Sequence, residues 1–317
     1  MHAEDAYRRW FFSEARTYSV LSIARGIMDE PSLAAPAHAP GTVAHILAQH
    51  AEAIAAMRAA LAADPLFDTA THDELWCVRF LLSHKGNVKK ALAAASATLA
   101  LRAERGLDEV RAFVTSHGRT EWPGWKTASE LAPYAIVHPD PDRGPCVCFR
   151  HALSDYHALA STTTNAYDEW MLHLRHLNEW VTAVCDAVTR RTGRLAKIVR
   201  LDDFEGFTLG KFSWKLIRRW SSRGAAEADI YPQMLGAVCA FHAPAMAERF
   251  WRALRPLLPP RVGDKFGLYD AKRPADAERL EAWIARSHLP EWLGGESGVT
   301  WPPPDATVAL ASRFRPG

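Results

Sequence analysis

The chain has 317 residues, of which 48% are hydrophobic, and its formal net charge at pH 7 is +2. This length fits one large domain or two ordinary ones, and the apolar content excludes a chain that is disordered throughout. The small net charge gives no overall field of the kind that attracts nucleic acid. A local basic patch could still attract an anionic membrane surface.

The five cysteines are scattered along the sequence, and their number is odd. This pattern favours free buried thiols in a reducing compartment over a disulfide framework. No signal peptide is predicted, because only three strongly apolar residues, Trp10–Phe12, follow Arg8 and Arg9. No uninterrupted apolar span reaches about 18 residues, so no transmembrane helix is predicted. We therefore expect a soluble cytoplasmic protein that contacts membranes transiently.

Residues 1–63 are interpreted as an N-terminal helical extension. Residues 4–28 have a helical pattern with an aromatic face, which either packs on protein or lies on a membrane. Residues 31–41 form a linker rich in proline and alanine. An alanine-rich helix over residues 42–63 follows, with Thr42 as its N-cap. This extension could serve a protein partner.

Residues 64–120 are predicted to form a compact helical unit. Asp73 and Glu74 precede an apolar helical stretch over 75–82, which ends at Lys85-Gly86. Asn87 is the expected N-cap of a helix over 88–105, and Gly106 stands just beyond its end. Another helix begins at 107–114. No catalytic signature occurs in this unit.

Residues 121–300 alternate between strands and helices, and 301–317 form a tail. Such alternation predicts an α/β domain with a mixed sheet and helices on at least one face. Two strands around the turn at 139–145 should form a hairpin. The expected elements are a turn at 122–125, strands at 134–137, 146–149, 197–201, 236–241 and 265–269, and helices at 165–192, 207–223 and 275–287.

The sequence lacks the common catalytic and nucleotide-binding motifs. It has no phosphate-binding or dinucleotide-binding glycine loop, no nucleophile elbow and no zinc-protease motif. His173 and His176 could pair on a metal, but no third ligand is evident, so a surface position is favoured. The acidic cluster Asp202, Asp203 and Glu205 follows a strand, where it either binds a ligand or turns the chain, and the turn is favoured. No catalytic residue, metal site or cofactor is predicted, and an enzyme is not expected.

Residues 231–262 combine an apolar run, 236–241, with an amphipathic segment. Met246, Phe250 and Leu254 recur at helical spacing, and arginines fill the other face. Pro256 should kink or end this helix. The segment either covers an apolar cavity, touches a lipid surface, or is a core helix with a solvated face. The pattern alone favours the core helix.

Six segments, in order, resemble motifs of the CRAL-TRIO lipid-binding family, which includes the phosphatidylinositol/phosphatidylcholine transfer proteins and the α-tocopherol transfer protein. The resemblance covers roughly residues 64–297. One segment, YPQMLGAVCAFHAP at 231–244, is similar to the family's "YPERLGxxxxINAP". The others are DELWCVRFLLSHKGNVKKA at 73–91, PDRGPCVCF at 141–149, VRLDDFEG at 199–206, FWRALRPLLP at 250–259 and LPEWLGGES at 289–297.

The resemblance implies a helical N-terminal part packed on a mixed sheet that helps to enclose one lipid in an apolar pocket. The segment matching 245–262 is the family's gate, which moves at membranes to exchange the ligand. Its apolar and cationic residues become the expected membrane contact. The residues assigned to the gate and membrane are Arg249, Phe250, Arg252, Leu254, Arg255 and Leu257.

Positions that bind lipid head groups in the family are largely changed here. Of the basic pair in the first motif only Lys85 matches, and the lysine before the gate proline is Arg255. The acidic position before Tyr231 falls near Ser222, and the phosphocholine-binding positions fall on Ile198 and Arg200. The predicted ligand-binding residues are Lys85, Ile198, Arg200, Asp202, Ser222, His242, Phe250, Leu254, Arg255 and Leu258.

Strand alternation places Ile198, Arg200 and Asp202 on one sheet face, which the resemblance makes the pocket face. A buried arginine needs a partner, so Arg200 either pairs with Asp202 or binds a phosphate or carboxylate of the ligand. The predicted function is binding of one phospholipid, such as phosphatidylinositol, or another hydrophobic molecule, and its transfer between membranes. The alternative is an interaction module that docks to a protein complex or membrane without transferring lipid.

Overall fold

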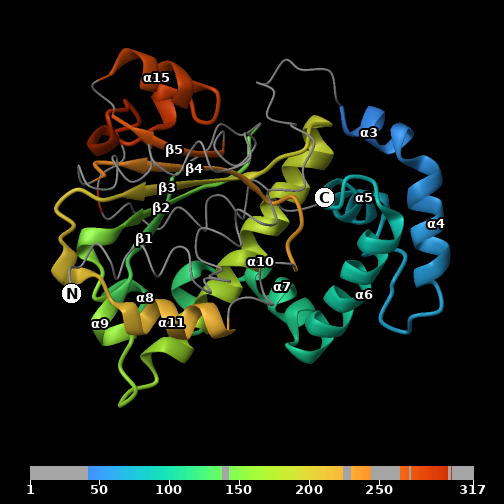
Figure 1. Ribbon diagram of the computed structural model, residues 1–317, viewed down its shortest axis with the longest axis horizontal. Helices are drawn as coiled ribbons and strands as arrows, with labels where there is room; N and C mark the ends of the chain where they lie inside the picture. Colours follow the sequence, from blue (N-terminus) through green and yellow to red (C-terminus); the bar gives the residue numbers. More distant parts are fainter. Residues whose placement is uncertain are drawn as a thin grey trace, which may run out of the picture.

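The computed structural model describes residues 42–137, 143–223, 230–243, 265–270, 273–298 and 301, with the backbone alone at 209, 217 and 220–223. Figure 1 shows a helical N-terminal part beside a sheet that has helices on both faces. The predicted helix over 4–28, the linker, the gate segment and the tail lie outside the described residues.

Two of the first described helices, α3 and α5, begin at side-chain caps, and the sequence predicts the cap at Thr42. The Thr42 hydroxyl accepts a hydrogen bond from the His45 amide at 3.3 Å, which starts α3, Val43–Gln49. The expected helix over 42–63 is interrupted at His50, and α4 covers Ala51–Leu61. Asp73 caps α5, Glu74–Ser83, by accepting from the Trp76 amide at 3.0 Å.

The next two helices follow the predicted boundaries closely. Asn87 accepts from the Lys90 amide at 3.0 Å and begins α6, Val88–Glu104. Gly106, with φ of 60°, allows the chain to turn into α7, Leu107–Ser116. One apolar core joins α3 to α6 across the predicted boundary between residues 63 and 64. Its largest members include Met57, Leu61, Phe80 and Leu81.

Among the described residues the sheet has five strands, in the order β1-β2-β3-β4-β5. The β1 and β2 strands form the predicted antiparallel hairpin, and the pairs β2–β3, β3–β4 and β4–β5 are parallel. This confirms the mixed sheet. The strands are β1 Tyr134–Val137, β2 Cys146–Arg150, β3 Ile198–Asp203, β4 Leu235–Phe241 and β5 Phe266–Tyr269.

The helices divide between the two faces of the sheet. Figure 1 shows α10, Ala166–Thr192, and α11, Trp214–Arg223, below the sheet, and α15, Pro274–Glu281, above it. Connections between adjacent parallel strands are almost always right-handed, so successive connections in one direction leave their helices on the same face. The shorter elements are α8 Trp125–Leu131 and α9 Tyr156–Leu159, and 3-10 turns at Arg119–Glu121, His151–Leu153, Leu209–Lys211, Arg286–His288 and Glu291–Leu293.

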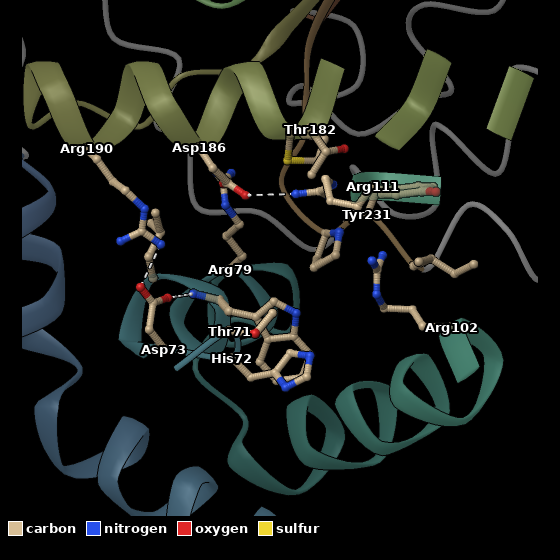
Figure 2. Close-up of a pocket in the computed structure, with 15 residues that line it drawn as sticks. Thr71, His72, Asp73, Arg79, Arg102, Arg111, Thr182, Asp186, Arg190 and Tyr231 are labelled. Carbon is tan, nitrogen blue, oxygen red and sulfur yellow. Dashed lines mark hydrogen bonds and ion pairs between the residues drawn. The ribbon is translucent and has the colours of Figure 1, made fainter. Parts of the chain in front are cut away.

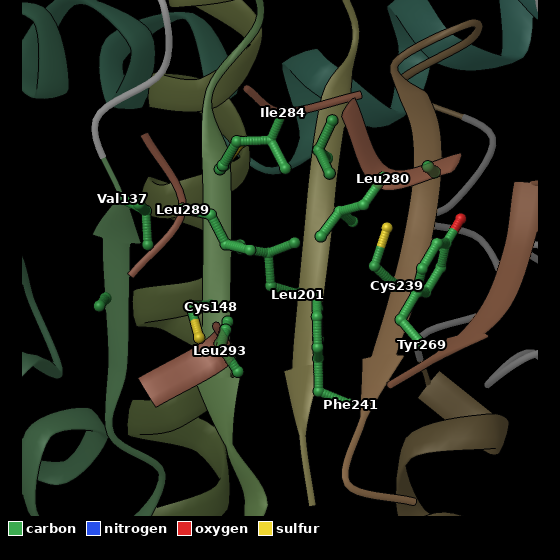
Figure 3. Packing of buried hydrophobic residues seen from close by; sticks show 14 residues of the cluster. Val137, Cys148, Leu201, Cys239, Phe241, Tyr269, Leu280, Ile284, Leu289 and Leu293 are labelled. Atoms are coloured by element: carbon green, nitrogen blue, oxygen red, sulfur yellow. The ribbon is translucent and has the colours of Figure 1, made fainter. Parts of the chain in front are cut away.

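The face of the sheet toward α15 is apolar, as Figure 3 shows. Leu201, Cys239 and Phe241 from the sheet pack with side chains from α15 and the turns that follow it. Cys146 and Cys148 share this face, and all five cysteines are buried free thiols, as the sequence predicts. Burial of the two aliphatic layers stabilises this face by about 25 cal/mol for each Å² of apolar surface removed from water.

The opposite face packs on α10, and here the surface position predicted for His173 and His176 is wrong. Both rings are buried, at 0% and 4% exposed. His173 Nε2 lies 2.8 Å from the Tyr134 hydroxyl and its Nδ1 lies 3.2 Å from the Pro123 carbonyl oxygen. Burial lowers the pKa of His173 to about 4. The pair is therefore part of the α10 core.

Residues 125–131 form α8, although the sequence indicates only a turn at this point. The residue that precedes this helix, Gly124, packs closely on α10. Gly124 has φ of 73°, and a Cβ atom here would lie 2.1 Å from the Glu169 carbonyl oxygen. This contact between distant residues has no local sequence signal. Within the described part of the chain, no helix combines the length and apolar character needed to cross a bilayer.

Candidate ligand-binding site

The carboxyl ends of β2, β3 and β4 bring a group of charged side chains together. The last two residues of β3, Asp202 and Asp203, are 5% and 1% exposed. Because adjacent residues of a strand point to opposite faces, each aspartate serves one side of the sheet. The sequence places these residues after the strand, whereas β3 extends through them. In open α/β sheets, ligands bind preferentially beyond this edge.

Asp202 joins Arg200 and His151 on the face toward α10. Its Oδ1 atom accepts from Arg200 Nε at 2.8 Å and lies 3.1 Å from His151 Nε2. The other ring nitrogen of His151 contacts the Tyr156 hydroxyl. Burial opposes ionisation of Asp202, but Arg200 and then His151 outweigh it and lower the pKa of the carboxyl. Asp202 is thus an ionised carboxylate held inside the protein.

Asp203 performs the turning role that the sequence favours. Its Oδ1 atom accepts from the Glu205 amide at 3.0 Å and lies 2.8 Å from His242 Nδ1, while Oδ2 accepts from Arg150 Nε at 3.0 Å. Asp203, Glu205 and His242 offer ligand atoms within 4.8 Å of one another, a spacing that a metal ion can use. Arg150 also pairs with Glu205 at 3.3 Å, so one guanidinium bridges both carboxylates.

Arg200 forms the internal pair with Asp202 and keeps donors available. Its side chain is 27% exposed, and its guanidinium carbon lies 4.9 Å from the centre of the Phe149 ring. Only Nε is engaged, so neither Nη group has a hydrogen-bond partner among the described residues. An arginine anchored at one edge of its guanidinium can bind a carboxylate or phosphate with the other.

The other predicted site residues are dispersed or lie outside the described chain. Ile198 starts β3 and packs partly against the α10 core, and exposed Lys85 follows α5 with φ of 54°. Ser222 lies in α11, where only its backbone is described, and exposed His242 joins the Asp203 group. The predicted gate and membrane residues fall in 244–264, outside the described residues, as do the ligand residues Phe250, Leu254, Arg255 and Leu258.

Three residues of the cluster are absent from the sequence prediction: Arg150, His151 and Tyr156. The register of the sheet brings them in, because β2 runs parallel to β3 with Arg150 opposite Asp203 and Phe149 opposite Asp202. Pairing the predicted strands in this order would have placed Arg150 beside an aspartate. No local signal marks His151 or Tyr156, which follow the strand in short turns.

A second feature of this end of the molecule is a basic and aromatic surface at the start of α11, where half-buried Phe212 precedes the helix. Its residues are Phe212, Trp214, Lys215 and Arg218, and we call it the α11 surface. Trp214 is 37% exposed and its ring lies 4.7 Å from that of Phe212. Lys215 and Arg218 are exposed, Leu216 is buried, and α11 contains no acidic residue.

Comparison with known proteins gives the family. A family model described as the CRAL/TRIO domain matches residues 132–295, just over half of the chain. The chain belongs to the CRAL/TRIO domain family. A solved structure, the crystal structure of Sfh5, is similar with a TM-score of 0.50 and 10% sequence identity, covering 86% of this chain and 96% of that one. At this identity the likeness to Sfh5 shows a shared fold alone.

Membership confirms the predicted resemblance and the α/β fold class. The CRAL/TRIO domain binds a lipid or another hydrophobic small molecule. This chain is therefore a member of a ligand-binding family. The polar groups at the carboxyl end of β3 belong to the matched region.

Proposed function

We propose that this protein binds one amphipathic lipid with an anionic or strongly polar head group and exchanges it at membranes. The observation that carries this proposal is the position of Arg200. It lies on the sheet face predicted to line the pocket, it is fixed by Asp202, and its two Nη groups have no partner among the described residues. The proposal includes no chemical step, cofactor or metal.

Affinity would come from two parts of the ligand. Each buried CH₂ of an acyl chain contributes about 0.8 kcal/mol. A phosphate or carboxylate on Arg200 would add charge-assisted hydrogen bonds, which are stronger than neutral ones. Because Asp202 already holds Nε, the guanidinium loses little further freedom when a ligand binds. Phosphatidylinositol and phosphatidic acid both fit this class of ligand.

The α11 surface supports a transient contact with membranes. Aromatic side chains settle at the interface between water and lipid, and each basic residue near an anionic leaflet contributes about 1 kcal/mol. The cationic residues predicted for the gate would add to the same attraction. A basic surface without carboxylates on its own helix favours an anionic lipid surface over a neutral one.

Native mass spectrometry of the purified full chain, followed by lipid extraction, tests the first part. We expect one bound lipid per chain. Arg200→Ala should weaken binding of anionic lipids about tenfold or more, because charge-assisted hydrogen bonds are lost. Arg194→Ala, an exposed arginine just before β3, is the matched control and should leave binding unchanged.

Asp202→Asn separates the ligand role of Arg200 from its internal pair. If Arg200 binds the ligand, this variant keeps the guanidinium and retains binding of anionic lipids. Equal binding by Arg200→Ala and the natural protein would reject the ligand role. Failure of any lipid to copurify, together with no uptake from vesicles, would reject lipid exchange and favour an interaction module.

Transfer itself is tested between vesicles with a fluorescent lipid. We expect charge reversal at Arg249, Arg252 and Arg255 to slow transfer while circular dichroism stays the same. The physical reason is the loss of attraction to anionic head groups at the predicted gate. An unchanged transfer rate in this triple variant would show that the segment is not the membrane contact.

A further inference from the structure

The junction between the helical part and the sheet domain encloses a cavity of about 80 Å³. Figure 2 shows arginines from α5, α6, α7 and α10 converging on it, beside the segment that leads into β4. Each molecule of liquid water occupies about 30 Å³, so the cavity has room for about two or three waters or one small oxyanion. Exposed Thr71 and Arg190 are among its lining residues and connect it to solvent.

The carboxylates around this cavity already have donors. Glu179, which is 0% exposed, accepts from Arg102 Nη1 at 2.8 Å, Arg111 Nε at 2.7 Å and the Tyr231 hydroxyl at 2.8 Å. Asp186 accepts from Arg79 Nη2 at 2.9 Å. Asp73 accepts from Arg190 Nη2 at 2.6 Å. These three carboxylates are therefore engaged before any ligand enters.

Donors remain, and the clearest is on Arg79. This side chain lines the cavity and the residue is 4% exposed, yet its Nε has no hydrogen-bond partner in the described part of the chain. A buried polar group without a partner costs about 1–3 kcal/mol, and more when it is charged. Native proteins fill such positions with ordered water or a bound ion.

His72 adds a second donor to the lining. Its Nδ1 accepts a hydrogen bond from the Asp68 amide at 3.0 Å, so the ring hydrogen is on Nε2. Burial, together with Arg102, lowers the pKa of His72, which keeps the ring neutral at pH 7. An excess of donors over free acceptors selects a ligand that accepts hydrogen bonds.

We propose that this cavity is a binding site for a phosphate-type oxyanion, held by Arg79 and Arg190 at the junction of the two parts. The oxyanion is either inorganic phosphate or the terminal phosphate of a larger molecule, including a lipid. The site differs from the head-group positions predicted at Lys85, Ser222 and Arg255 and from Arg200. It does not depend on the lipid-exchange proposal.

The surrounding charges determine how the anion is held and how its affinity depends on salt. Four arginines are balanced by four carboxylates: Asp73, Asp108, Glu179 and Asp186. The anion is therefore held by directed hydrogen bonds more than by net charge, and its affinity should depend only weakly on salt. Its binding would tie α5 to α10 and to the segment that enters β4.

Isothermal titration of the full chain with phosphate, compared with chloride at equal ionic strength, tests the proposal. We expect saturable binding at one site. Arg190→Gln should weaken it roughly fivefold, since one half-exposed charge-assisted hydrogen bond is lost. Arg191→Gln, the exposed neighbour on the same helix, does not line the cavity and should change nothing.

A crystal structure of the natural protein grown in phosphate gives an independent readout. A tetrahedral anion within hydrogen-bond distance of Arg79 Nε supports the site. Waters alone in the cavity, no saturable binding, or equal weakening by both variants would overturn it. Vesicles containing phosphatidic acid distinguish the source: competition with phosphate assigns the group to a lipid, and the lack of competition assigns it to a soluble molecule.

Discussion

The two ends of the central sheet hold buried carboxylates in different ways. At the end where β4 begins, Glu179 is enclosed by two arginines and a tyrosine that come from α6, α7 and the segment before β4. At the end where β3 finishes, Asp202 and Asp203 are held by one arginine and one histidine each. Both arrangements satisfy a buried charge, as low-dielectric interiors require.

The two groups differ in how many of their hydrogen-bonding atoms already have partners. Every oxygen of Glu179 is engaged, and burial together with Glu179 raises the pKa of Tyr231, so that its hydroxyl remains a donor. This group joins the helical part to the sheet domain. At the other end, Arg200 keeps both Nη groups without partners among the described residues, and each aspartate is contacted by a histidine. We infer that the first group maintains the fold and the second binds the ligand.

The largest effect should come from breaking the Glu179 group. Glu179→Gln removes a carboxylate that is 0% exposed and leaves Arg102 and Arg111 with only the more exposed Asp108 and Asp186 as ionised partners. Removing one member of a buried ion pair costs about 3–5 kcal/mol. Urea unfolding monitored by circular dichroism measures this loss. Glu109→Gln, an exposed glutamate of α7, should change stability by less than about 0.5 kcal/mol.

His173, on the helix that also carries Glu179, should give the second largest effect. The pKa of His173 is about 4 in the folded protein and about 6.5 when unfolded, so the unfolded chain binds more protons between these values. The contribution of neutral His173 to the free energy of unfolding is fully present above pH 6.5. It is lost as pH falls toward 4, and the total loss is about 3 kcal/mol. His173→Phe should flatten the stability profile in this window, and an unchanged slope would contradict the assignment.

The α11 surface lies at the ligand-binding end, and its charge reversal should have a smaller effect. Lys215→Glu combined with Arg218→Glu should weaken binding to vesicles rich in phosphatidylserine by roughly thirtyfold, at about 1 kcal/mol for each residue. Sedimentation with vesicles measures this. Lys89→Glu with Lys90→Glu, an exposed pair on α6, is the control. If both double variants lose vesicle binding equally, the α11 surface is not a specific membrane contact.

The smallest effect should be the loss of the pair between Arg200 and Asp202. Because the pKa of Asp202 is lowered in the folded protein, its contribution to stability is present above the unfolded value of about 3.9 and is lost as pH falls below it. Arg200→Gln should remove about 1 kcal/mol at pH 7 and move acid unfolding to higher pH. The measurement is the unfolding midpoint of both proteins between pH 7 and 3. If the pair contributes nothing, the midpoint will fall with pH in the same way in both proteins.

Local rules predict most of the described elements. Thr42 and Asn87 cap helices where the sequence indicates, because each forms a hydrogen bond within three residues along the chain, and Asp73 caps α5 in the same way. The hairpin and the parallel strands follow from short apolar runs bounded by turns. The helix expected over 42–63 breaks at His50, and α8 is not anticipated, since the close contact of Gly124 with α10 joins residues far apart in the chain.

The candidate sites were predictable in part. Strand alternation correctly groups Arg200 with Asp202, and the ion pair between them is one of the two roles that the sequence leaves open for Arg200. Arg150 and His151 join the group only through the pairing of β2 with β3, a contact across about 50 residues of chain. The cavity at Arg79 needs four helices at once, so no single segment of sequence carries its signal.

The order of the strands in space is also their order along the chain. Each strand therefore pairs with the one made just before it, starting from the local hairpin of β1 and β2. During synthesis the sheet can grow outward from that hairpin, and no late strand has to insert between two that are already paired. At every stage one growing edge awaits the next strand. The topology thus suits folding on the ribosome, where domains form progressively from the N-terminal side.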